Sequence, residues 1–178
     1  AATLKHYKEV AQSLGLNPSE MLRDVGLTPT MLNDPEFLLP LEAALKLLES
    51  SADHSSCPTF GLRMAEARRM SDIGVVSLLL GHQRTLRDML HTSIEYRHLL
   101  NRTLAMNLET AGNMVVIREE IMAEAGEPKR QATELAIGIL HRTCKSVMGS
   151  LWNPQSVHFS HEAPASQKEH ARFFRCRV

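Results

Sequence analysis

The strongest hydrophobic pattern in the sequence is an apolar stripe that begins just after Lys129. Apolar residues recur there at i, i+3 and i+4 spacing, which places them on one face of a helix. They are Ala132, Leu135, Ala136, Ile139, Leu140 and Val147. The pattern predicts a helix of about five turns that ends at Gly149, because glycine favours helix C-termini and Pro154 prevents continuation.

The residues after this helix follow a different pattern. Val157-His158-Phe159, flanked by Ser156 and Ser160, alternates between apolar and polar residues and predicts a half-buried strand. A terminal helical turn is expected to follow, and Val178 has the position of the start of a further strand. Strands before and after the long helix indicate that its stripe packs on a sheet.

The first hundred residues show the 3.6-residue period in shorter segments, separated by glycine, proline and N-cap residues. The predicted helices cover residues 4–14, 18–25, 28–33, 40–52, 59–69, 73–80 and 86–101. Their predicted N-caps include Asn17, Thr28, Thr59 and Thr85. Residues 74–80 are apolar nearly all round, so we expect that segment to be buried.

Between residues 103 and 121 the period changes from 3.6 to 2. Leu104, Met106 and Leu108 alternate with polar residues, and Ile117 and Ile121 continue the alternation after a turn at residues 110–113. This pattern predicts an antiparallel β-hairpin. The order of elements predicts an α+β fold, an N-terminal helical layer followed by a small antiparallel sheet with one long helix packed on it. We expect a single domain over residues 1–178, with a helical part at about 1–101 and a hairpin–helix–strand part at about 102–178.

Charge disfavours nucleic-acid binding by this segment alone. Lys+Arg and Asp+Glu both number 20, whereas nucleic-acid binders are typically basic. The helices at 4–14 and 18–25 imitate a helix-turn-helix, but the second one carries Glu20, Arg23 and Asp24 and is net acidic. Phosphate contacts require lysine and arginine, so we interpret this pair as a packed helical hairpin. The basic segment 168–177 is either a solvated run or an approach to a neighbouring domain.

The remaining compositional features favour a cytoplasmic protein. No apolar run has the length of a membrane span, and no signal peptide is evident. The cysteines, Cys57, Cys144 and Cys176, are odd in number and form no C-x-x-C, which is typical of a reducing compartment. Cys144 lies near the apolar stripe and is interpreted as a small core residue. Phosphate-loop, dinucleotide, nucleophile-elbow and zinc-protease motifs are all absent, so we expect neither an enzyme nor a cofactor.

Two clusters of polar residues are candidates for a site. His91, Glu95 and His98 have i, i+4, i+7 spacing on the predicted 86–101 helix, which suits zinc or iron, with a haem ligated by His98 as a variant. The alternative, which we favour, is the solvated face of an amphipathic helix, since no fourth ligand is visible. Arg118 and Glu120 share one face of the hairpin, which either lines a ligand cavity or, as we favour, faces solvent.

Short stretches spread over the whole chain occur in an order and spacing typical of one family. They include Gly15-Leu16-Asn17-Pro18, Leu32-Asn33-Asp34-Pro35, Pro58-Thr59-Phe60-Gly61-Leu62-Arg63, Glu95-Tyr96-Arg97-His98-Leu99-Leu100, Trp152-Asn153-Pro154, Val157-His158-Phe159-Ser160-His161 and Phe173-Phe174-Arg175-Cys176-Arg177-Val178. In these stretches the chain resembles the N-terminal effector-sensing domain of AraC/XylS-type bacterial transcription regulators, of the arabinose-binding-like type.

The resemblance implies a small-molecule effector, a homodimer, and DNA binding only through a C-terminal pair of helix-turn-helix units. Those units are expected to be absent from this chain, and the last strands of the sensing domain are expected to be cut. The resemblance fixes no ligand residues. As polar groups of an effector pocket we predict Tyr96, Arg97, Arg118 and His158. A dimerisation module without ligand and a metal or haem sensor remain the alternatives; no membrane partner is expected.

Overall fold

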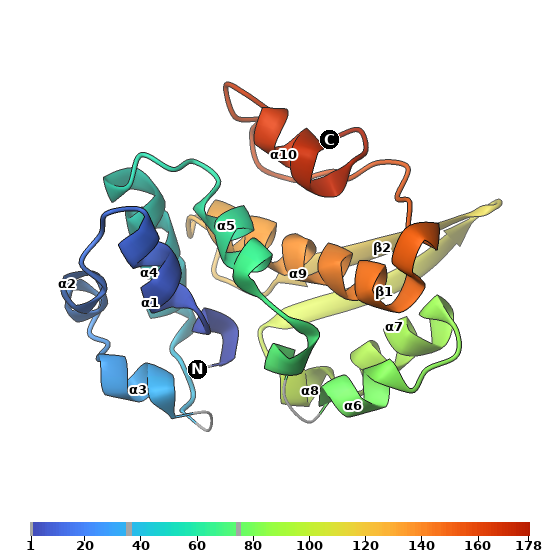
Figure 1. The fold of residues 1–178 in the computed structure, drawn as a ribbon, viewed down its shortest axis with the longest axis horizontal. Helices are drawn as coiled ribbons and strands as arrows, with labels where there is room; N and C mark the ends of the chain where they lie inside the picture. Colours follow the sequence, from blue (N-terminus) through green and yellow to red (C-terminus); the bar gives the residue numbers. More distant parts are fainter. Residues whose placement is uncertain (1, 35–36, 74–75) are drawn as a thin grey trace.

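The computed structural model describes residues 2–34, 37–73 and 76–178, and it has the predicted α+β fold (Figure 1). In chain order its elements are η1 (Ala2–Leu4), α1 (Tyr7–Ser13), α2 (Pro18–Asp24), α3 (Pro29–Asn33), α4 (Leu41–His54), α5 (Phe60–Ala67), η2 (Met70–Ile73), α6 (Val76–Gly81), α7 (Leu86–Glu95), α8 (Arg97–Leu100), β1 (Leu104–Ala111), β2 (Met114–Ile121), α9 (Arg130–Met148), η3 (Gly149–Leu151) and α10 (Lys168–Phe174). In the described part of the chain, no helix is both long enough and apolar enough to cross a membrane.

Side-chain caps begin three of the short helices where the sequence predicts them. The side chains of Asn17, Thr28 and Thr85 accept hydrogen bonds from the backbone N–H groups of Ser19, Met31 and Asp88. The predicted cap at Thr59 is wrong, because its hydroxyl accepts no bond from α5. Its ψ of 33° differs from the extended ψ of 103° to 155° at the three working caps, and this backbone does not aim the hydroxyl at the first helical turn.

The predicted helix over 86–101 is in fact two helices. Tyr96 leaves helical geometry with ψ of 17°, so α7 ends at Glu95 and α8 is a separate turn. The half-buried Tyr96 packs against a core cluster at this break.

The expected burial of residues 74–80 is also wrong in part. Val76 and Leu80 are buried, but Leu78 is 65% exposed and Leu79 41%, because only one face of the short α6 packs on the core; Gly74 and Val75 lie outside the described residues.

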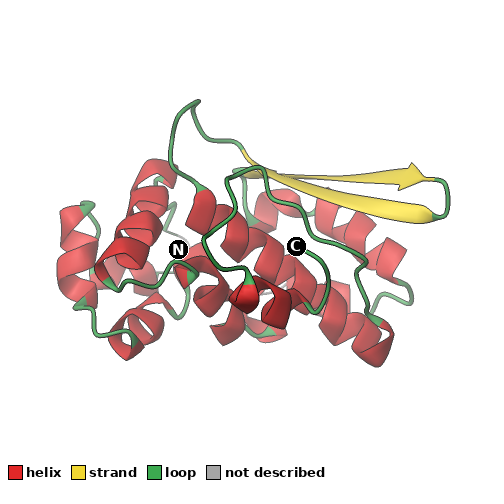
Figure 2. Cartoon of the chain, turned by 90° about the horizontal axis from the view of Figure 1, so that it is seen from above, coloured by secondary structure: helices red, strands yellow, loops and turns green. Residues whose placement is uncertain are grey.

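The hairpin forms as predicted but its strands are longer. β1 pairs antiparallel with β2 from Leu104↔Ile121 to Ala111↔Met114, which leaves a two-residue turn at Gly112-Asn113. Gly112 has a positive φ of 62°, which favours glycine at this turn. Figure 2 shows that the turn end of the hairpin extends beyond the helices.

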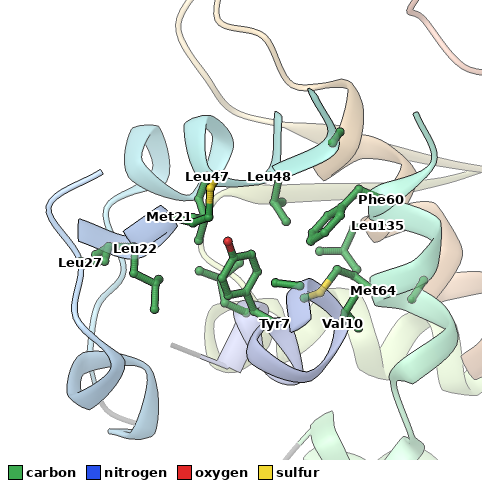
Figure 3. Packing of buried hydrophobic residues seen from close by; sticks show 14 residues of the cluster. Tyr7, Val10, Met21, Leu22, Leu27, Leu47, Leu48, Phe60, Met64 and Leu135 are labelled. Carbon is green, nitrogen blue, oxygen red and sulfur yellow. The ribbon is translucent and has the colours of Figure 1, made fainter. Parts of the chain in front are cut away.

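Two clusters of buried side chains form the core, and α9 contributes to both. The first joins α1, α2, α4 and α5 to Leu135 of α9. Figure 3 shows the Tyr7 ring of this cluster among Leu47, Leu48 and Phe60, and its hydroxyl lies 2.8 Å from Ser51 Oγ. The second cluster joins α6 and α7 to Cys144 of α9, and the inner face of the hairpin packs against it. The long helix is therefore the element around which the chain packs.

The predicted strand over residues 156–160 is wrong. Ser156 makes only an isolated parallel bridge with Arg177, in which the N–H of Val157 donates to the carbonyl of Arg177 at 2.9 Å. The alternation instead serves aromatic packing, since the Phe159 ring stacks on His161 and contacts the rings of His170 and Phe174. The segment after η3 is thus held by side-chain contacts near α10, which lies over α9 (Figure 1).

Candidate functional site

A cavity of about 360 Å³ lies where the C-terminal end of α9 meets α10. Its walls come from α9, from residues 149–154 and from the end of α10. The lining residues are His141, Lys145, Gly149, Ser150, Trp152, Asn153, Pro154, Phe174 and Arg175. Its volume lies at the lower end of the range of small-molecule sites.

Two residues with positive φ shape the cavity walls. Gly149 ends α9 with φ of 58° and ψ of −128°, a conformation that is essentially restricted to glycine, and the chain turns there into η3 and Trp152. Arg175 ends α10 in the left-handed region, with φ of 54°. His141 and Lys145 are one helical turn apart, so both face the same side of α9.

His141 is the central polar group of the cavity. It is buried among aromatic rings, and the indole N–H of Trp152 donates to its Nδ1 at 3.1 Å. Burial lowers the pKa of His141 to about 4, helped by the positive charges of Lys145, Arg142 and Arg175. The imidazole is therefore neutral near pH 7, with Nδ1 as an acceptor and its proton on Nε2.

The charged groups of the cavity are cations without partners. Among the described residues, neither the Lys145 nor the Arg175 side chain makes an ion pair or a hydrogen bond. The described lining contains no acidic side chain. The cavity is therefore a positively charged site with aromatic walls.

A buried carboxylate holds α10, which forms one wall of the cavity, against α9. Glu134 is fully buried, and its Oε1 lies 3.0 Å from Arg130 Nε and 3.0 Å from His170 Nε2. His161 Nε2 is 3.6 Å from the same oxygen. These contacts hold α10 and the segment before it against α9, which positions Phe174 and Arg175 over the cavity.

Comparison with known proteins now identifies the family. The family model described as the arabinose-binding domain of AraC transcription regulators, N-terminal, matches residues 15–178. The chain belongs to this family. Two curated relatives, the HTH-type transcriptional regulator VirS from two strains of Mycobacterium tuberculosis (CDC 1551 / Oshkosh and ATCC 25618 / H37Rv), are each 25% identical to it over 181 residues. The alignment covers 100% of this arabinose-binding domain and 53% of each relative, so the chain spans about half the length of these relatives.

Membership confirms the class of function predicted from sequence. Arabinose-binding domains of AraC regulators are ligand-sensing regulatory domains, a class that is not typically enzymatic. Among the described residues, no hydrogen bond, ion pair or ring contact joins the four predicted effector contacts to one another. Tyr96 is half-buried at the α7–α8 break, whereas Arg97, Arg118 and His158 are exposed. Arg118 pairs with Glu109 at 3.3 Å, and His158 Nε2 is 3.0 Å from Ser156 Oγ. None of these four residues is among the described residues that line the cavity.

The candidate metal ligands are also separated by the break at Tyr96. His91 and Glu95 lie on α7 and His98 on α8, so the three no longer share one continuous helix face, and all are exposed. In the described ranges, no group of three His, Cys, Asp or Glu side chains is placed to hold a metal ion.

The residues that line the cavity of this arabinose-binding domain were missed because, along the long helix, only the apolar positions were followed. Glu134, Gly138, His141 and Lys145 recur at i, i+4, i+7 and i+11, the spacing of one helix face. A polar stripe beside the apolar one, in which Glu134 and His141 are buried and Lys145 is exposed, was the available signal. Its partners on α10 and at Trp152 come from distant sequence positions that periodicity does not connect.

Acidification is expected to destabilise this domain through His141. The unfolded chain binds a proton at His141 near pH 6.5, whereas the folded chain does so only near pH 4. The unfolded state therefore binds more protons between these values, and the free energy of unfolding falls as pH falls through this window. Urea unfolding at several pH values should show a smaller loss for His141→Gln than for the unchanged chain. His158→Gln, the same change at an exposed position, is the control. Parallel pH profiles for His141→Gln and the unchanged chain would contradict a neutral buried His141.

Proposed function

We propose that this arabinose-binding domain binds a small-molecule effector in the cavity between α9 and α10 and that binding controls the DNA-binding half of a transcription regulator. Family membership supports the sensing role. The observation that carries the location is the cavity with partnerless cations and aromatic walls. We place the effector there rather than at Tyr96, Arg97, Arg118 and His158, since none of these four residues lines the cavity.

The proposed mechanism is a population shift. One wall of the cavity belongs to α9, which also packs on the domain core, and the other belongs to the C-terminal segment with Trp152, Phe174 and Arg175. A ligand that contacts both walls favours the arrangement in which this segment lies on α9. In a regulator whose sensing domain is N-terminal, this segment lies toward the DNA-binding half, so its arrangement biases how that half is presented.

Homodimerisation is a separate proposal that is compatible with sensing. Met114, Val115 and Val116 at the hairpin tip are 45%, 49% and 38% exposed, and apolar side chains grouped at a surface favour association. Sedimentation equilibrium checks it: a chain that stays monomeric at high concentration contradicts this proposal and leaves the effector proposal standing.

The experiment for the sensing role is a thermal-shift screen of the chain against amino acids, sugars, fatty acids and aromatic acids. A ligand that binds only the native state is expected to raise the melting temperature in a concentration-dependent way, by about 2.7 kcal/mol of stabilisation at a hundredfold excess over its dissociation constant. The full-length regulator is then tested for promoter DNA binding with each hit. Identical DNA binding with and without every hit would contradict control of the DNA-binding half.

A further inference from the structure

We infer that the cavity is built for a small organic anion with a flat ring, an aromatic carboxylate, rather than for a neutral sugar. The inference rests on the proposed effector-binding function and names the chemical class of its ligand. It depends on three features of the cavity: its partnerless cations, the donor that His141 presents, and the aromatic rings in its walls.

The first feature is the pair of cations. Lys145 and Arg175 line the cavity without a protein partner among the described residues. Four arginines of this chain, Arg63, Arg118, Arg130 and Arg172, do form ion pairs. Arg172, three residues before Arg175, makes ion pairs with Glu66 and Glu169 at 2.7 and 2.9 Å. Two cations at one cavity with no nearby acid favour an anion, and a carboxylate matches the fork of an arginine.

The second feature is the protonation state of His141. Because its Nδ1 accepts from Trp152, the neutral ring carries its proton on Nε2. In the described part of the molecule, this Nε2–H has no protein acceptor. This N–H is a hydrogen-bond donor for a carboxylate oxygen of a ligand, and it adds no third full positive charge to the cavity.

The third feature is the size and character of the walls. Trp152, Phe174 and His141 contribute ring surfaces, and Pro154 adds an apolar face. A volume of about 360 Å³ suits one ring with a short acidic arm. A neutral sugar would offer no negative charge to Lys145 and Arg175. The description of the family as arabinose-binding therefore does not fix the ligand of this chain.

The chain carries its own reporter for the test. Trp152 is the only tryptophan of the sequence and lines the cavity, so a ligand there changes the intrinsic fluorescence. The probes are phenylacetate, its neutral isostere phenylacetamide, acetate as an anion without a ring, and arabinose. Phenylacetate is expected to change the Trp152 emission with a dissociation constant about tenfold or more below that of each other probe, the ratio typical of losing a charge-assisted hydrogen bond.

Variants locate the binding site. Lys145→Gln and Arg175→Gln are each expected to weaken phenylacetate binding about tenfold. The control is Lys46→Gln, which removes the same charge from an exposed position of α4 and should leave binding unchanged. Lys145 is itself exposed, so its variant is expected to fold, and the melting temperature of each variant without ligand checks this.

The outcomes separate this inference from the sensing function. Tighter or equal binding of phenylacetamide or arabinose, reported by Trp152, would overturn the anion class and leave an effector cavity standing. Unchanged phenylacetate binding in both Lys145→Gln and Arg175→Gln would also overturn it. If no probe changes the fluorescence and the wider thermal-shift screen finds no ligand, both the inference and the sensing function fail.

Discussion

Replacing Gly61 with alanine is expected to lower the free energy of unfolding by about 3 kcal/mol, the upper end of the usual cost of overpacking. Gly61 lies in α5, where it faces the first turn of α9. A Cβ atom added there would overlap the carbonyl oxygen of Gln131 and would lie 2.9 Å from its carbonyl carbon. It would also lie 3.1 Å from the backbone nitrogen of Leu135. These are backbone atoms of α9, so no side-chain rotation relieves the overlap and the two helices must separate.

The separation would also break a buried hydrogen-bond network. The N–H of Gly61 donates to the side-chain carbonyl of Gln131 at 2.8 Å, and the amide of Gln131 donates to the carbonyl of Pro58 at 3.0 Å. Gln131 is only 2% exposed, so groups that lose their partners there have no water to replace them. Both effects of Gly61→Ala therefore act in the same direction.

Urea unfolding followed by circular dichroism measures the effect. Gly81→Ala is the matched control, because Gly81 is also a helical glycine, at the end of α6, and an added Cβ there meets nothing within 4 Å. We expect that variant to change stability by less than about 1 kcal/mol. Equal unfolding midpoints for Gly61→Ala and Gly81→Ala would show that α5 and α9 do not pack through Gly61.

The features predicted correctly from sequence depend on interactions between near neighbours. The caps at Asn17, Thr28 and Thr85 each join residues two or three apart. The hairpin needs only alternation and a two-residue turn, and the long helix needs only its own period. Such features need few distant contacts, which explains why these elements agree with the structure.

The incorrect predictions concern segments whose conformation is decided by distant contacts. Residues 156–160 alternate like a strand, but Phe159 packs on His170 and Phe174, more than ten residues away. The helix over 86–101 breaks where Tyr96 turns onto the second core cluster. Periodicity carries no information about which partner a face meets, and this is also why the cavity at His141 and Trp152 was not predicted.

Glu119 is a half-buried residue that the sequence reasoning also missed, and it leads to the second large expected effect. It lies on β2 opposite Met106, on the hairpin face that also carries Ile117 and Ile121 and that packs on the helices. Its Oε2 is buried and has no hydrogen-bond partner. Burial raises the pKa of Glu119 to about 7. Burial and, secondly, the negative charge of Glu119 raise the pKa of the Cys144 thiol to about 12. The Glu119 carboxyl therefore lies near α9.

At pH 8, Glu119→Gln is expected to have a free energy of unfolding on the order of 3 kcal/mol above that of the unchanged chain, whereas at pH 5 the difference should be small. The size follows from the pKa difference of Glu119 between the folded and unfolded states, because each pKa unit corresponds to about 1.4 kcal/mol. Between pH 4.5 and about 7 the folded chain keeps the proton of Glu119 while the unfolded chain releases it. The folded state then binds more protons, so the free energy of unfolding of the unchanged chain falls as pH rises through this window and levels off above it. At pH 5 both side chains are neutral and similar in shape, so the two proteins should be nearly equally stable.

The measurement is urea unfolding of both proteins at pH 5, 6, 7 and 8, with the difference in the free energy of unfolding plotted against pH. Glu120→Gln, which removes the same charge from the exposed face of the same strand, controls for net charge and should change stability by less than about 0.5 kcal/mol. Taking the difference in the free energy of unfolding between the two proteins at each pH cancels the contribution of every other titrating group, His141 included. A Glu119→Gln difference that stays constant from pH 5 to pH 8 would mean that the Glu119 carboxyl reaches water or a partner, and that the inner face of the hairpin is open rather than packed.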